Sequence, residues 1–158
     1  EHNLPGYEPV ATCGEWLVAL MNDSPQYAAG EIRTMQKHTL TDEVFVLLSG
    51  QCTLFVAEGG DKPEAIRAVT MKPGITYTVL KNVWHTHSLC KGTKVLVVEN
   101  SDTDRSNSPI EFLDEEQWRW IKENSCRLFN KKGVCRMIPV PEKRMADSER
   151  TGPGPLIR

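Results

Sequence analysis

The sequence predicts an all-β fold, an antiparallel barrel or sandwich of short strands that is followed by one short helix. Runs rich in valine, leucine, threonine and phenylalanine recur every eight to twelve positions between Glu15 and Val98. Clusters of turn residues separate these runs. The chain has 158 residues, of which 39% are hydrophobic and 25% charged, as is typical of one globular domain with its own core.

The runs between the turns are short enough to be strands that pair with their neighbours. Ser49-Gly50-Gln51 is typical of a tight hairpin, and in Lys72-Pro73-Gly74 the proline restricts one dihedral angle while the glycine tolerates a positive one. We therefore expect adjacent antiparallel strands. The eight expected strands are Glu15–Met21, Glu31–Lys37, Glu43–Leu48, Cys52–Ala57, Ile66–Met71, Ile75–Leu80, Trp84–Cys90 and Lys94–Glu99.

A helix is expected over residues 115–124, after the last strand. Asp114 is a suitable N-cap, and Glu115 and Glu116 suit the positive end of the helix dipole. Trp118 and Ile121 are three positions apart and are expected to face inward. The barrel and this helix form the predicted domain, residues 1–126.

Residues 127–158 are predicted to be a poorly ordered tail. They contain four prolines, and eight lysines and arginines against three acids, which gives this segment a net charge of +5. Such a charge can bind nucleic acid, and that alternative predicts binding that weakens steeply with salt and is lost when the tail is removed. The tail lacks interleaved aromatic residues and a helical face, so we expect a solvated or loosely docked tail and no nucleic-acid partner.

The cysteine content and the hydropathy pattern indicate a cytoplasmic protein. The five cysteines are an odd number, scattered too widely for a metal clip and too few for a disulfide framework. We expect thiols, although Cys126 and Cys135 could bridge around a loop. No apolar run approaches the roughly 18 residues of a spanning helix.

Two short segments resemble the conserved motifs of the cupin superfamily. Gly30, His38, Glu43 and Gly50 have the spacing of the first motif, in which Gln36 replaces the first histidine. Gly74 and His85 fit the second motif, which the sequence departs from at Leu80, Asn82 and Leu89. The resemblance covers roughly residues 15–100. It implies an antiparallel jelly-roll barrel, a metal site on these residues and a homodimer.

Physical reasoning points to the same side chains. The two-residue period of a strand puts Gln36 and His38 on one face, and Glu43 opens the next strand after a polar loop. His85 would add an imidazole from a separate hairpin. Two histidines and one carboxylate with open positions suit Fe(II), and similar donors accept Mn, Ni, Co, Cu or Zn, so the identity of the metal stays open.

The sequence leaves two alternatives open, one for the role of Gln36 and one for the presence of a metal. Glutamine is a weak neutral donor, so its presence at the position of a histidine should lower the metal affinity, and Gln36 can instead orient water or substrate. The alternative to a metal site is a hydrogen-bonded polar cluster of His38, Glu43 and His85 in a metal-free barrel.

The catalytic candidates are Glu43 and His87. His87 follows His85 by two positions and is expected to share its face in a regular strand, where it is either a further ligand or a group that exchanges protons near neutral pH. The alternative is a histidine that is hydrogen-bonded or partly exposed and has no role in the site. Trp84 should face the other way and pack in a wall. Glu99, near the end of the last strand, is a weaker candidate for the pocket. Tyr77, Phe45, Phe55 and Met35 either line the barrel mouth or pack in the core.

The function expected from these residues is a divalent-metal-dependent enzyme, an isomerase, lyase or dioxygenase that acts on a small sugar or carboxylic acid. In such an enzyme the metal polarises a substrate oxygen and a nearby histidine or glutamate moves a proton. The alternative is a non-catalytic module that binds a small ligand or a metal. The fold alone does not separate the two, because one scaffold hosts many functions.

Overall fold

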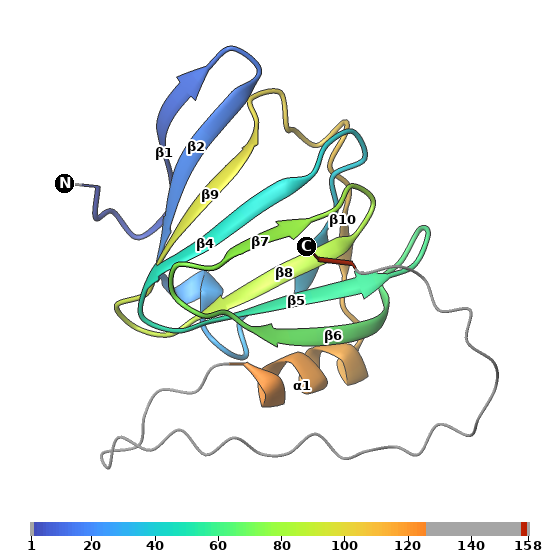
Figure 1. Ribbon diagram of the computed structural model, residues 1–158. Helices are drawn as coiled ribbons and strands as arrows, with labels where there is room; N and C mark the ends of the chain where they lie inside the picture. Colours follow the sequence, from blue (N-terminus) through green and yellow to red (C-terminus); the bar gives the residue numbers. More distant parts are fainter. Residues whose placement is uncertain (1, 126–155, 158) are drawn as a thin grey trace.

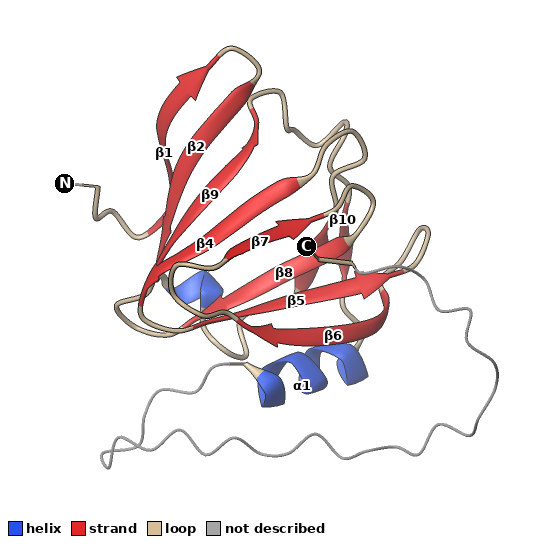
Figure 2. Ribbon diagram, viewed as in Figure 1, coloured by secondary structure: helices blue, strands red, loops and turns tan. Residues whose placement is uncertain are grey.

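The computed structural model describes residues 2–125 together with residues 156 and 157, and its strands form two antiparallel five-stranded sheets packed into a jelly roll (Figure 1). The strand order is β1-β2-β9-β4-β7 in the first sheet and β10-β3-β8-β5-β6 in the second. Figure 2 shows the helix α1 (Glu115–Asn124) next to strand β6. The elements are β1 (Gly6–Cys13), β2 (Trp16–Asn22), the short 3-10 helix η1 (Pro25–Tyr27), β3 (Thr34–Gln36), β4 (Glu43–Ser49), β5 (Cys52–Glu58), β6 (Glu64–Thr70), β7 (Thr76–Val79), β8 (Trp84–Leu89), β9 (Lys94–Asn100), β10 (Ile110–Phe112) and α1 (Glu115–Asn124).

The predicted fold class is confirmed, and each of the eight predicted strands overlaps an observed strand. Their ends differ by at most two residues except at β3, which covers only Thr34–Gln36 of the expected residues 31–37. Two strands, β1 and β10, are not predicted by the sequence. Strand β1 is difficult to recognise in the sequence because it contains proline and glycine, which are depleted in strands. Its ladder with β2 is also irregular between Pro9 and Ala11. Strand β10 has only three residues, too few to give a recognisable alternation. Both strands lie at sheet edges.

The tight hairpin between β4 and β5 is confirmed, and Gly50 is required in it. Gly50 has a φ of +81°, in the left-handed region that favours glycine. A Cβ atom at this position would lie 2.5 Å from the Cα and Oγ1 atoms of Thr93, which is shorter than real contacts allow. This close approach brings the β4–β5 turn against the residue that precedes β9.

The core has two layers, because β5 is covered on both faces. Leu54 and Val56 point between the two sheets, and Phe55 and Ala57, which alternate with them, point toward α1. All four side chains are buried. The layer beneath α1 also contains Trp84 and Ile121.

Helix α1 has the predicted bounds and the predicted N-cap. The Asp114 side chain accepts a hydrogen bond of 2.8 Å from the Gln117 backbone, and the Gln117 side chain accepts one of 3.0 Å from the Asp114 backbone. This reciprocal capping box defines the start of the helix. Ile121 is fully buried, as expected, whereas Trp118 is only partly buried and donates its indole N–H to the Gly30 carbonyl.

The predicted tail lies almost entirely outside the described residues. Its two described residues, Leu156 and Ile157, pack against the layer between the sheets, and Ile157 pairs with Val79 of β7. Cys126 and Cys135 also lie outside. None of Cys13, Cys52 and Cys90 forms a disulfide. Within residues 2–125 and 156–157, no helix is long and apolar enough to cross a membrane.

Candidate metal centre

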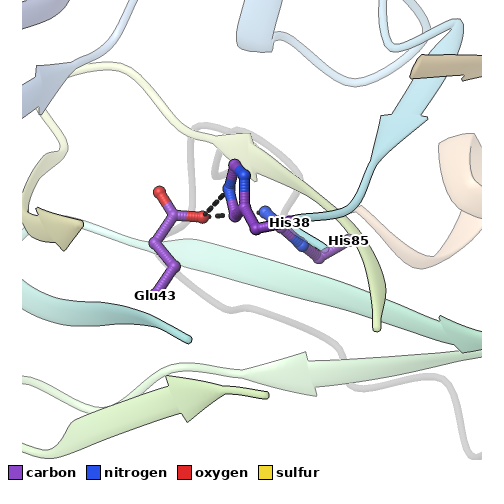
Figure 3. A group of neighbouring side chains, drawn as sticks. All are labelled: His38, Glu43 and His85. Carbon is purple, nitrogen blue, oxygen red and sulfur yellow. Dashed lines mark hydrogen bonds and ion pairs between the residues drawn. The ribbon is translucent and has the colours of Figure 1, made fainter. Parts of the chain in front are cut away.

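Three predicted site residues, His38, Glu43 and His85, meet between the two sheets (Figure 3). Glu43 is the first residue of β4 in the first sheet, His85 belongs to β8 in the second, and His38 lies two residues beyond the end of β3. The Glu43 Oε2 atom lies 2.9 Å from the His38 Nε2 atom and 2.8 Å from the His85 Nε2 atom. All three side chains are buried.

The second nitrogen of each imidazole has its own partner, which sets the orientation of the ring. The His85 Nδ1 atom lies 3.1 Å from the Val83 carbonyl oxygen, which can only accept, so this nitrogen donates. The His38 Nδ1 atom lies 2.7 Å from the Ser108 hydroxyl oxygen, and that hydroxyl donates to the Asn107 side chain. The His38 Nδ1 atom therefore donates to Ser108. Both Nε2 atoms then face Glu43, as the nitrogens of metal-binding histidines do.

Electrostatic interactions within the cluster shift the pKa values of Glu43 and His38. Burial alone would raise the pKa of Glu43, but the hydrogen bonds from His38 and His85 and their attraction hold it at about 2. Burial alone would lower the pKa of His38, but its hydrogen bond to Glu43 and the negative charges of Glu43 and Glu99 together outweigh burial and raise it. Glu43 is thus an ionised carboxylate at neutral pH.

The donor atoms of the three residues lie within 4.8 Å of one another, so one ion can reach all of them. Two imidazole nitrogens and one carboxylate oxygen are the donors of a facial site for a divalent transition metal. The residues therefore fit the metal that the sequence predicts. Their role as ligands stays a prediction.

Gln36 lies beside this cluster. It is paired with His85 across β3 and β8, and its amide nitrogen lies 3.5 Å from the His85 Nε2 atom. The expected strand over residues 31–37 is too long, because β3 begins only at Thr34 and ends at Gln36. Both Gln36 and His38 nevertheless line the same cavity, as predicted. A half-turn of the amide would present its oxygen to the cluster. The role of Gln36 as a fourth ligand stays a prediction.

His87 lines the cavity as predicted but is not part of the metal cluster. Its ring packs against Tyr27 at a centroid distance of 5.0 Å and against Phe45 at 6.0 Å. Burial lowers the pKa of His87 to about 4, so the ring is neutral at pH 7 and the expected titration near neutral pH is wrong. Its Nδ1 atom is buried and has no hydrogen-bond partner among the described residues. A neutral imidazole with a vacant nitrogen is a suitable base, although its catalytic role stays a prediction.

The cluster lies in a cavity of about 580 Å³. Of the four residues proposed for the mouth or the core, only Phe45 lines this cavity, whereas Met35, Phe55 and Tyr77 pack in the two core layers. Glu99 lines the cavity. Trp84 points away from it into the layer beneath α1, as the strand period predicts.

Several cavity residues are not predicted by the sequence analysis. Ser108 belongs to the loop between β9 and β10, Tyr7 to the unpredicted strand β1, and Tyr27 to the short helix η1. Arg33 and Arg105 lie at exposed positions of the lining. Nothing local in the sequence marks these residues, because only the pairing of distant strands brings them to the site.

Replacing Ser108 with alanine is expected to weaken metal binding about tenfold, because loss of a hydrogen-bond partner of a metal-binding histidine typically costs ten- to a hundredfold. The change removes only the hydroxyl that holds the His38 Nδ1 atom. Competition with a chelating dye measures the affinity. Ser106→Ala is the matched control, because the Ser106 hydroxyl belongs to the same loop and bonds to Asp104 instead. Equal affinities of the two variants would refute the positioning role.

Comparison with known proteins finds similarity at the level of structure. No protein-family profile matches the sequence, and no curated protein matches it significantly. A cupin-2 domain protein from Shewanella frigidimarina is 21% identical over 62% of this chain and 83% of its own, with a TM-score of 0.44. Hydroquinone 1,2-dioxygenase from Sphingomonas sp. TTNP3, with 4-hydroxybenzoate bound, is 7% identical over 63% and 67%, with a TM-score of 0.49. Hydroxypropylphosphonic acid epoxidase from S. wedmorenis is 22% identical over 59% of this chain and 49% of its own, with a TM-score of 0.42.

The structural neighbours are thus cupin-fold proteins at low sequence identity, and this chain spans about half the length of the epoxidase. The chain's own sheets and side chains define its class. It is a small antiparallel jelly-roll protein with a buried cluster of two histidines and one glutamate that is compatible with a metal ion.

Proposed function

We propose that the protein is a divalent-metal-dependent enzyme that acts on a small polar metabolite, such as a sugar or a carboxylic acid, as an isomerase, lyase or dioxygenase. The observation that supports this proposal best is the convergence of two buried histidine Nε2 atoms on one ionised carboxylate oxygen. Buried charges of this kind pair with each other or coordinate metals. His38, Glu43 and His85 would hold the ion, with Gln36 beside them.

The donor set restricts the kind of metal but not its identity. Imidazole suits Zn, Cu, Fe and Ni, a single carboxylate also accepts Mn and Co, and two histidines with one carboxylate leave several positions open for substrate. When bound, such an ion supplies a Lewis acid that polarises a substrate oxygen.

The rest of the cavity supports a reaction on a small molecule. A volume of about 580 Å³ falls within the range of roughly 300–1,000 Å³ that small-molecule sites occupy. His87 is neutral and carries a buried nitrogen without a hydrogen-bond partner among the described residues, so it can accept a proton from a substrate. Phe45 supplies an apolar wall against both His85 and His87.

A non-catalytic module that binds a metal or a small ligand is the second candidate. The observation that favours it is Gln36, whose amide takes the place of a stronger imidazole donor beside His85. The enzyme and a metal-binding module require the same metal site, whereas a module that binds only a small ligand does not, so a test of that site comes first. A homodimer and a cytoplasmic location remain predictions.

Metal content measured by plasma mass spectrometry tests the proposal. The protein should be purified without a metal-affinity column. We expect near-stoichiometric metal in the wild type and loss of metal in both His38→Ala and His85→Ala, because each change removes a nitrogen donor.

His87→Ala is the matched control, because His87 lines the same cavity outside the cluster. It should retain its metal. Absence of metal from every sample would overturn the metal-dependent enzyme and leave the metal-free ligand-binding module. A substrate screen on the metal-loaded protein then separates the enzyme from the binding module.

A further inference from the structure

A second carboxylate, that of Glu99, lies next to Glu43 on the wall of the cavity. Strands β4 and β9 pair antiparallel, with Val44 opposite Val98 and Phe45 opposite Val97. This register puts Glu43 and Glu99 on directly neighbouring positions of the two strands, and both side chains line the cavity. Cross-strand neighbours of this kind have Cβ atoms about 5 Å apart.

Glu99 is a part-buried carboxylate that has no lysine or arginine partner among the described residues. The Tyr7 hydroxyl donates a hydrogen bond to the Glu99 Oε1 atom. Among residues 2–125 and 156–157, no lysine or arginine forms an ion pair with Glu99. Burial raises the pKa of Glu99, and the negative charge of Glu43 raises it further. A cation bound beside Glu99 would stabilise its ionised form more strongly than the attraction to His38 does alone.

The two arginines of the cavity do not supply that charge. Arg33 and Arg105 are exposed, and the Arg33 guanidinium lies 3.8 Å from the centre of the Trp118 ring. The cavity lining instead includes the aromatic rings of Tyr7, which bonds to Glu99, and of Tyr27. Aromatic faces attract cations. This part of the cavity therefore favours a cation.

We propose that Glu99 and Tyr7 form a subsite for the protonated amine of a ligand whose other end binds at the metal. The amine would occupy the space between the Glu99 carboxylate and the tyrosine rings, and it would form the ion pair that no described lysine or arginine forms with Glu99. The ligand is then a small amine that also carries oxygen donors. This inference rests on the proposed metal site, and it narrows the substrate class of that site.

Three hydroxamates of equal length test the subsite on metal-loaded protein. A hydroxamate chelates the metal, and the far end of each probe carries an ammonium group in β-alanine hydroxamate, a hydroxyl in β-hydroxypropionohydroxamate or a methyl in butyrohydroxamate. We expect the ammonium probe to bind at least about tenfold more tightly than the methyl probe, because a hydrogen bond to a charged group is worth that factor. Isothermal titration calorimetry measures the three dissociation constants.

The variant Glu99→Gln is expected to reduce the preference for the ammonium probe to less than about threefold, since it keeps the shape and removes the charge. Glu31→Gln, which removes an exposed carboxylate of the same cavity, should keep the preference. If both variants lost the preference for the ammonium probe equally, the overall negative charge of the cavity would explain that preference. This result would overturn the subsite.

The wild type alone can also overturn the inference, even if Glu99→Gln fails to fold. Equal affinities for the ammonium and methyl probes would exclude an amine subsite, and equal affinities for the ammonium and hydroxyl probes would exclude charge as its basis. A protein that takes up no metal would contradict the proposed function instead, so metal content is measured before the titrations.

Discussion

Replacing Glu43 with glutamine is expected to lower the metal affinity by a hundredfold or more. The substitution keeps the shape of the side chain and removes its charge, and a neutral amide oxygen is a weak donor for a transition metal. Loss of a direct ligand should exceed the ten- to hundredfold effect of losing an outer hydrogen-bond partner. Competition with a chelator of known affinity measures the change.

Glu99→Gln is the matched control for this experiment. Glu99 is a carboxylate on the neighbouring strand of the same cavity, but its atoms are not part of the His38–Glu43–His85 cluster. We expect its metal affinity to stay within about threefold of the wild type, because a charge outside the coordination shell acts only through the local field. An equal loss in the two variants would mean that the general negative charge of the cavity holds the ion, against the proposed coordination by Glu43.

The three clustered residues could be predicted because each of them lies in a short segment with its own pattern. His38 and Glu43 occur between Gly30 and Gly50, and His85 follows a turn and a strand start. The period of two along a strand then indicates which side chains share a face. The same reasoning separates His85, which faces the cavity, from Trp84, which faces α1.

The positioning residues could not be predicted, because their contacts join segments that are far apart in sequence. Ser108 contacts His38 across 70 positions, and Tyr7 contacts Glu99 across 92. Each lies outside the predicted strands. Residue type alone does not distinguish one serine or tyrosine from the others in the chain. These partners are therefore recognised only from the positions of the loop after β9 and of the edge strand β1 in the fold.

Asn82 shows why a departure from a motif need not disturb the site. It occupies a position where the cupin motif has glycine, and its φ of +65° lies in the left-handed region. Asparagine is one of the few other residues that adopt this conformation readily. The Asn82 backbone N–H donates a hydrogen bond of 2.7 Å to the His38 carbonyl. The turn before β8 therefore still holds the segment that carries His38.

Trp84→Ala is expected to lower the free energy of unfolding by about 3–5 kcal/mol, the usual cost of replacing a buried large aromatic side chain by alanine. Trp84 is 1% exposed and packs with Phe55 and Ile121 in the layer between the second sheet and α1. Equilibrium unfolding in urea, followed by circular dichroism, measures the change.

Trp16→Ala provides the comparison for this loss. Trp16 is also a strand tryptophan, at the start of β2, but it is 46% exposed. We expect a change within about 1 kcal/mol, because substitutions of exposed residues usually have small effects. If the two variants were equally stable, the layer beneath α1 would not be a packed core. The rigid support of the β8 segment next to His85 would then have to come from the layer between the sheets alone.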